Sequence, residues 1–452
     1  MENNPTGGKR VGPIELLPGI SRMNFWTFML AAFVCIGLLA TLNIAQSYIL
    51  VQHLGIPWSE QGALSGNLTF VTEIMSIVLI APFGILADRV GRRSVLIVGI
   101  LFVGAGYALY PYATSAEDLY LYRILFGIGI PATAAMTGTI QNDYPADGSR
   151  GKLLGTTAIF NSLGILFLSF IIAQMPNILF KSGWDPITAG KLAFGFGALV
   201  CFVSAFAFRF GLKGGTPATK TERLPYRVLI PSGFKAARNP RIALAYFSAF
   251  TARGDVVVFG LFIALWAQQA GWALKMNPGE SMAVASVTIV VVTIASMIWA
   301  GIFGVIMDRI NRVSAVAISQ LLGACGYLSM IFVTSPLDYA MMPAFILLGA
   351  GMSGAMMASF VVIGQEANYK ERGAVTGMNG LFGSMGILVA AVLGGRLFDA
   401  FEPWAPFAMV GVAQLVIFAA AVVIRIVAPG ELPSKSRNGP ADLAPAASET
   451  AT

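Results

Sequence analysis

Long apolar runs with few or no charges constrain this chain more than any other feature of its sequence. A helix needs about 20 apolar residues to cross a bilayer core about 30 Å thick. Twelve stretches meet or approach that requirement: 24–50, 61–87, 94–116, 124–142, 153–180, 191–208, 242–269, 281–307, 313–337, 339–365, 373–395 and 403–424. The sequence therefore predicts an all-α integral membrane protein with twelve transmembrane helices.

The composition excludes an ordinary soluble enzyme. Only 11% of the 452 residues are charged, whereas a soluble domain carries about 25%. The single histidine, His53, argues against a histidine-ligated metal centre or a Ser-His-Asp triad. Cys35, Cys201 and Cys325 lie in apolar runs without metal-ligand spacing. We therefore expect no enzyme activity, no cofactor and no metal.

The basic residues indicate how the chain is oriented. Lys and Arg are retained on the cytoplasmic side of short loops, and 23 of the 29 basic residues fall in segments that share a side with both termini. We expect a multi-pass protein of the cell inner membrane with both termini in the cytoplasm. The net charge of +7 then reflects topology, and we expect no nucleic-acid partner.

The polar segments divide the chain into five parts. We expect a cytoplasmic N-terminal segment, an N-terminal six-helix bundle, a cytoplasmic central loop, a C-terminal six-helix bundle and a disordered cytoplasmic tail rich in Pro, Ala and Ser. Their bounds are 1–23, 24–210, 211–240, 241–428 and 429–452.

Three pairs of motifs recur at a nearly constant spacing. An Asp-Arg step followed by further arginine closes both the second and the eighth apolar run, with its aspartates 220 residues apart (308 − 88 = 220). Gly127 pairs with Gly349, and Arg150 pairs with Arg372, each 222 residues apart. This spacing predicts tandem six-helix repeats, an arrangement typical of rocking transporters.

The first of these motifs resembles the signature of the major facilitator superfamily, a family of transporters. It reads Gly84-Ile-Leu-Ala-Asp88-Arg89-Val-Gly91-Arg92-Arg93, and its degenerate copy holds Asp308, Arg309 and Arg312. The resemblance extends over all twelve predicted helices. It implies two pseudo-symmetric bundles that rock about a central cavity, and we expect a monomer.

The resemblance also implies a gate at the cytoplasmic side. Asp88 lies at the C-terminal end of a helix, where the dipole disfavours a carboxylate, and one of the two arginines that follow can compensate it. In the family this aspartate caps the start of the eleventh span, here near Arg372. By the repeat, Asp308 faces the start of the fifth span near Gly151. The alternative is that these charges only fix topology.

Four ionisable residues lie inside predicted spans, where a charge is costly. They are Glu73, Arg123, Arg253 and Asp255. Residues two apart on a helix point to nearly opposite sides, so Arg253 and Asp255 need separate partners. The resemblance places Arg123, Arg253 and Asp255 at the cavity. An arginine there can grip a carboxylate, and Glu73 and Asp255 are candidates for proton exchange. The alternative is static salt bridges between helices.

Neutral polar residues in spans give a weaker signal. Asn43, Gln46, Asn161 and Asn379 are candidate substrate-binding residues. Hydrogen bonds between helices explain such residues about as often as ligands do.

The absence of a phosphate-cradling P-loop indicates transport driven by an ion or solute gradient. We expect a secondary transporter of a small organic solute, with an anionic metabolite as its substrate and a proton as the coupling ion. A first alternative is proton-driven efflux of drugs or toxic metabolites, although the run from Gly155 to Phe167 departs from the Gly-Pro pattern of drug exporters. A second alternative is a sensor on this fold that transports nothing.

Overall fold

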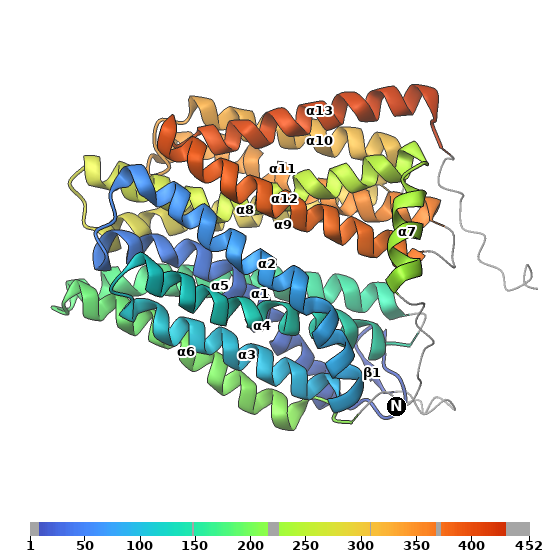
Figure 1. Ribbon diagram of the computed structural model, residues 1–452, viewed down its shortest axis with the longest axis horizontal. Coiled ribbons are helices and arrows are strands. Elements are labelled where there is room, and N and C mark those ends of the chain that lie inside the picture. Colours follow the sequence, from blue (N-terminus) through green and yellow to red (C-terminus); the bar gives the residue numbers. More distant parts are fainter. Residues whose placement is uncertain (1–8, 147–148, 216–225, 308, 368–371, 431–452) are drawn as a thin grey trace, which may run out of the picture.

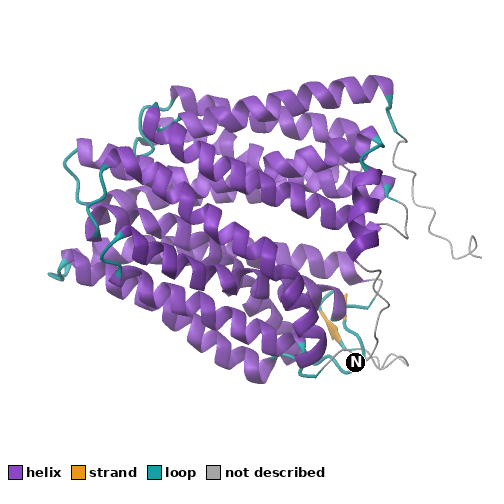
Figure 2. Cartoon of the chain, viewed as in Figure 1, coloured by secondary structure: helices purple, strands orange, loops and turns teal. Residues whose placement is uncertain are grey.

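The computed structural model describes residues 9–146, 149–215, 226–307, 309–367 and 372–430. Among these residues, twelve helices are long and apolar enough to span a membrane. Long helices dominate the fold (Figures 1 and 2). The predicted all-α fold is therefore confirmed. The long helices are α1 (Arg22–Tyr48), α2 (Trp58–Val90), α3 (Arg92–Leu109), α4 (Ala116–Asp143), α5 (Arg150–Lys181), α6 (Pro186–Gly211), α8 (Pro240–Ala273), α9 (Pro278–Met307), α10 (Arg312–Ser329), α11 (Met342–Glu366), α12 (Arg372–Ala400) and α13 (Ala405–Val427).

Short elements connect or flank the long helices. A two-stranded antiparallel hairpin precedes α1, and a short helix lies in the predicted central loop; the sequence analysis predicted neither. The short elements are β1 (Arg10–Val11), β2 (Ile14–Glu15), η1 (Ile49–His53), η2 (Tyr110–Tyr112), α7 (Tyr226–Ala236), η4 (Met330–Phe332) and η5 (Tyr339–Met341). Of the tail predicted to be disordered, residues 431–452 lie outside the described residues.

The local sequence explains how several helices begin and end. In hydrocarbon, every backbone polar group must be satisfied within the segment, so the apolar runs fold as helices. α1 and α4 each begin with a capping box, built by Ser21 with Asn24 and by Ser115 with Asp118. α2 ends at Gly91, whose φ of 90° favours glycine, and an added Cβ there would lie 2.7 Å from the carbonyl oxygen of Gly215.

Helices α1–α6 and α8–α13 form two bundles that lie side by side (Figure 1). Each bundle contains a crossing at which two backbones touch. A Cβ on Gly164 of α5 would overlap the carbonyl group of Phe33 on α1, and a Cβ on Gly386 of α12 would overlap that of Phe250 on α8. The two glycines are 222 residues apart (386 − 164 = 222), which is the spacing of the sequence motifs.

A second pair of equivalent contacts supports the same symmetry. The Tyr107 hydroxyl of α3 donates to the carbonyl oxygen of Leu38 on α1 at 2.7 Å. The Tyr327 hydroxyl of α10 donates to the carbonyl oxygen of Asp255 on α8, also at 2.7 Å. The predicted pair of pseudo-symmetric six-helix bundles is therefore confirmed.

The bundles contact each other at the end of the molecule opposite α7. The ring centroids of Trp58 on α2 and Trp272 on α8 are 6.2 Å apart. The Gln174 amide of α5 donates to the Ser286 hydroxyl of α9 at 3.0 Å. These contacts join α2 to α8 and α5 to α9, so they close one end of the interface between the bundles.

Toward α7 the two bundles diverge (Figure 1). Glycines in this half of the helices face open space. A Cβ added to Gly84 of α2, Gly155 of α5 or Gly377 of α12 would have no neighbouring heavy atom within 4 Å. The two bundles are therefore in contact at one end and diverge toward the α7 end.

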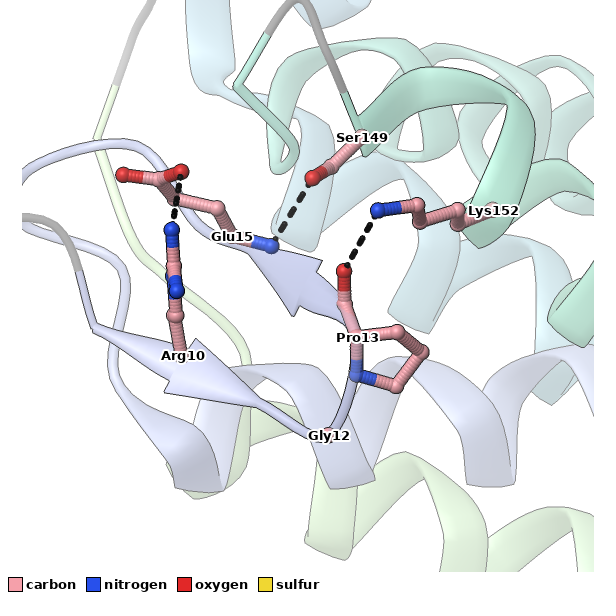
Figure 3. Close-up of a pocket in the computed structure, with 6 residues that line it drawn as sticks. All are labelled: Arg10, Gly12, Pro13, Glu15, Ser149 and Lys152. Carbon is pink, nitrogen blue, oxygen red and sulfur yellow. Dashed lines mark hydrogen bonds and ion pairs between the residues drawn. The ribbon is translucent and has the colours of Figure 1, made fainter.

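The N-terminal hairpin packs against the connection between α4 and α5 (Figure 3). The backbone N–H of Glu15 donates to the Ser149 hydroxyl at 3.0 Å, and the Lys152 ammonium donates to the carbonyl oxygen of Pro13 at 3.1 Å. Arg10 pairs with Glu15 at 3.5 Å. These residues line a small polar cavity of about 300 Å³, in which the drawn charges pair with the protein's own groups.

We predict that Gly164→Ala destabilises the protein, because α1 and α5 must separate to admit the methyl group. Overpacking of this kind lowers the free energy of unfolding by about 1–3 kcal/mol. The midpoint of thermal unfolding in detergent measures the effect. Gly155→Ala is the control on the same helix, and it should leave the midpoint unchanged or slightly higher. Equal midpoints for Gly164→Ala and the unmodified protein would contradict the backbone contact.

Candidate functional site

The innermost helices of the two bundles are α1 and α8. Their apolar windows are 67% and 72% buried, the highest shares among the twelve spans. An exposed polar side chain on such a helix faces the space between the bundles, since neighbouring helices cover the other sides. On α8, Arg253 and Val256 are exposed, whereas Thr251 and Asp255 are buried on the opposite face.

Arg253 shares its part of the interface with a carboxylate from the other bundle. Its aliphatic stem packs on Gly383 of α12, where an added Cβ would lie 2.8 Å from its Cγ. Ser384 of the same helix lies beside Glu73 of α2, and Arg253 lies close enough to attract that carboxylate. Among the described residues the two charged groups form no ion pair within 4.0 Å. The N-terminal bundle thus supplies the anion and the C-terminal bundle supplies the cation and the hydroxyl.

Asp255 lies inside the C-terminal bundle, away from Arg253. Its side chain has no exposed surface, and its Oδ2 accepts from the Gln414 amide of α13 at 3.0 Å. Its Oδ1 has no hydrogen-bond partner among the described residues. Arg253 and Asp255 lie on different faces of α8, and the structure does not bring Asp255 to the face that Arg253 occupies.

Arg123 of α4 is the centre of a polar network within the N-terminal bundle. It is only 1% exposed and donates to Gln46 Oε1 of α1 at 2.5 and 3.2 Å. The Tyr110 hydroxyl donates to the same oxygen at 2.5 Å, and the Gln46 amide donates to the Ser65 hydroxyl at 2.9 Å. Arg123 also donates to Asn43 Oδ1 at 3.0 Å.

The network contains no carboxylate that pairs with the positive charge of Arg123. Among the described residues, no carboxylate oxygen is paired with Arg123 within 4.0 Å. Its positive charge is instead stabilised by amide and hydroxyl oxygens and by the rings of Tyr110 and Phe126, whose centroids lie 5.5 and 5.7 Å from the guanidinium carbon. Asn43 is partly buried, whereas the other members of the network are buried. Asn43 is therefore the member with the most exposed surface.

The remaining two asparagines lie on equivalent helices. Asn161 of α5 is partly buried, and its Oδ1 has no hydrogen-bond partner among the described residues. Asn379 of α12 is 1% exposed and accepts from the Ser359 hydroxyl of α11 at 2.9 Å. Asn161 therefore keeps an unused acceptor, whereas Asn379 joins two helices of its own bundle.

The predicted gating motif lies at the α7 end. Arg92 pairs with Asp143 at the end of α4, and Arg93 donates to the carbonyl oxygen of Leu212 at 3.4 Å. The arginine at 312 donates to the carbonyl oxygen of Met307. Arg89 and Arg309 are exposed. The side chains of Asp88, Asp308 and Arg372 lie outside the described residues.

The fold and the motifs agree with a comparison against known families. The profile of the Major Facilitator Superfamily matches residues 28–367 and 279–450. The chain belongs to this superfamily, whose members are membrane transporters of small molecules and not enzymes.

Several proteins are similar to this chain over most of its length. The magnetosome protein MamH of Paramagnetospirillum magneticum is 26% identical, with 92% of this chain and 94% of MamH covered. MamZ of the same organism is 27% identical over 87% of this chain, which spans only 61% of MamZ. Multidrug resistance protein 2 of Bacillus subtilis is 22% identical, covering 81% and 86% of the two chains.

A solved structure shows the same fold. The crystal structure of the nucleoside transporter NupG matches with a TM-score of 0.71 and 14% sequence identity, covering 89% of this chain and 99% of that one. At this identity the likeness concerns the fold alone.

Sequence reasoning missed several partners of the predicted residues. Tyr110 and Ser65 complete the Arg123 network, and Gln414 binds Asp255. No spacing rule connects these residues, because their contacts depend on how separate helices pack. One missed residue did carry a signal: Asp399 is an acidic residue in the last turn of α12, where a helix disfavours negative charge.

We predict that Gln46→Leu destabilises the protein by about 1–3 kcal/mol, because the buried guanidinium and the Tyr110 hydroxyl lose their shared acceptor. A double-mutant cycle with Arg123→Leu, read from thermal unfolding, should give a coupling energy of at least about 0.5 kcal/mol. Additive effects of the two substitutions would show that the network does not stabilise the bundle.

Proposed function

We propose that this protein is a secondary active transporter that moves a small organic anion together with a proton by alternating access. The observation that carries the proposal is that Arg253, Glu73 and Ser384 lie near one another at the interface between the bundles, with Arg253 close enough to attract the Glu73 carboxylate. This group joins helices that must move apart and together when the bundles rock. A ligand bound there would therefore sense and influence the motion.

The proposed coupling follows from charge balance. When the site is empty, Glu73 compensates Arg253. A substrate carboxylate binds the guanidinium through two parallel hydrogen bonds and displaces Glu73. An unpaired carboxylate is costly in this low-dielectric region, so Glu73 takes up a proton. The occupied site then holds one cation, one anion and a neutral acid, and its net charge is unchanged.

Neighbouring polar residues would complete the substrate site. We propose that Asn43 and Asn161 contact the substrate directly, since both are partly buried on helices that border the interface. Arg123 donates to Asn43 and is itself held by Gln46. The guanidinium adds positive potential to this part of the site. Asn379 contributes indirectly, because its hydrogen bond with Ser359 holds α12 against α11. Asp255 is a second candidate proton carrier, but its burial inside one bundle favours Glu73 for this role.

The observed conformation fits one state of the proposed cycle. The basic residues favour a cytoplasmic location for the α7 end and an inner-membrane location for the protein, so the open side faces the cytoplasm. We propose that the bundles at 24–210 and 241–428 rock as units joined by 211–240. Closure of the α7 end would bring the motif around Gly84, Asp88 and Gly91 toward the start of α12.

A second candidate is the export of amphiphilic drugs, which the similarity to Multidrug resistance protein 2 favours. Uptake and export assays with lipophilic cations distinguish the two. Cation export that survives Arg253→Ala would favour drug efflux over anion transport.

We predict that Arg253→Ala lowers uptake of the transported anion by at least about tenfold, the equivalent of about 1.4 kcal/mol of lost binding. The measurement is uptake of a panel of small organic anions by proteoliposomes that contain the purified protein. Arg209→Ala, an exposed arginine at the end of α6, is the matched control and should transport normally. Intact anion uptake by Arg253→Ala would overturn the site assignment.

We predict that Glu73→Gln uncouples transport from protons, because the amide carries no titratable proton. Uptake driven by a pH gradient should fall to background, while exchange of labelled for unlabelled anion across the membrane should persist. Proton flux measured with a pH-sensitive dye in the same vesicles tests this. A normal response of Glu73→Gln to the pH gradient would assign coupling to another group.

A further inference from the structure

Asp399, in the last turn of α12, reaches across the interface to the beginning of α2. Its Oδ1 accepts from the backbone N–H of Gly62 at 2.8 Å, and its Oδ2 accepts from that of Ala63 at 2.6 Å. α12 belongs to the C-terminal bundle and α2 to the N-terminal bundle. Both oxygens of one carboxylate are therefore bound to the backbone of the other bundle.

These bonds join the carboxylate to the positive end of α2. The two N–H groups belong to the fifth and sixth residues of α2, which begins at Trp58. They therefore lie in its second turn, near the end that the helix dipole makes positive. A bond from N–H to an ionised oxygen is stronger than a neutral one.

The helices approach closely enough here that the two hydrogen bonds depend on the closed state of this end. A Cβ added to Gly62 would lie 2.6 Å from the carbonyl oxygen of Gly395 and 2.6 Å from Asp399 Oδ1. One turn further along, a Cβ on Gly66 would overlap the carbonyl oxygen of Ala391. Separation of α2 from α12 at this end must break both hydrogen bonds.

Asp399 is also poorly placed within its own helix. It lies at the C-terminal end of α12, where the dipole is negative. The negative charge of Glu60 on α2 opposes the contact in the closed arrangement, but the two backbone hydrogen bonds outweigh it there. Its local surroundings therefore favour the carboxylate only while the N-terminus of α2 is beside it. The Asp399 carboxylate is therefore stabilised by two hydrogen bonds when this end is closed and is unfavourably placed when this end is open.

We propose that Asp399 is the latch of the gate at the end opposite α7. It stabilises the closed arrangement of that end by accepting two backbone hydrogen bonds near the positive end of α2, and it releases α2 when the bundles rock to the alternate state. The proposal rests on the movement of the two bundles and is independent of the substrate, the coupling ion and the roles of Arg253 and Glu73.

The test measures distances between spin labels on the full-length protein in lipid nanodiscs without substrate. One label pair, Tyr112→Cys with Phe332→Cys, reports on the latch end, and a second pair, Phe210→Cys with Ile426→Cys, reports on the α7 end. All four positions are well exposed, from 58% to 80%. The native cysteines are replaced by alanine.

We expect Asp399→Asn and Asp399→Ala to raise the ratio of open to closed populations at the latch end by roughly fivefold or more, the lower range of a typical conformational coupling. The α7 pair should shift toward shorter distances in the same samples. Glu402→Gln removes a neighbouring exposed carboxylate and should leave both distributions unchanged.

Distances in both Asp399 variants that match those of the unmodified protein would overturn the latch. A change at the latch end without the reciprocal change at the α7 end would overturn it as well, because it would indicate local fraying of α2. If Asp399→Ala does not fold, Asp399→Asn retains the side-chain shape and one acceptor and gives the answer. Loss of anion transport by Arg253→Ala has no bearing on these distances, so the two proposals fail separately.

Discussion

The architecture depends on two places where helix backbones touch. In lipid, apolar side chains gain little by leaving the bilayer for another helix, so association relies on close packing. Gly164 admits the backbone of α1 at Phe33, and Gly386 admits that of α8 at Phe250. These crossings fix the innermost helix of each bundle against a neighbour and determine which faces of α1 and α8 remain for the interface. Each bundle is therefore suited to move as a unit.

The same low-dielectric environment separates the buried polar groups into two kinds. Arg123 and Asp255 find their partners within one bundle, so rocking leaves those bonds intact. Glu73 lies near Arg253 and Ser384 of the other bundle, and Asp399 binds the backbone of the other bundle, so rocking must change the surroundings of both carboxylates. Groups of the second kind are the ones that can link a bound ligand or a proton to the conformation of the molecule.

Much of this organisation could be predicted from sequence. Spans follow from length and hydropathy, and the twofold relationship follows from motif spacing, because both depend on local composition. The opposite faces of Arg253 and Asp255 follow from helical geometry alone. The partner of Asp255 could not be predicted, since Gln414 is 159 residues away and is brought near only by the packing of α8, α10 and α13.

Other features escaped prediction for different reasons. The hairpin at Arg10–Val11 and Ile14–Glu15 is too short to leave a periodic pattern, and its stability comes from hydrogen bonds with Ser149 and Ala146. Asp399 is a different case. The argument from the helix dipole that singles out Asp88 applies equally to Asp399, but without the fold there was no way to identify the helix start that compensates it.

The placement of α7 has a mechanical consequence. The Tyr246 hydroxyl of α8 donates to the carbonyl oxygen of Gly233 at 3.0 Å, and Gly233 also contacts Met378 of α12, so α7 is anchored to the C-terminal bundle. Residues 212–215 contact Gly91 and Arg93 of the N-terminal bundle. The covalent tether between the bundles is then residues 216–225, whose length allows a span of at most about 35 Å at about 3.5 Å per residue. The tether therefore does not limit how far the bundles rock, and the noncovalent contacts between them set the amplitude of the motion.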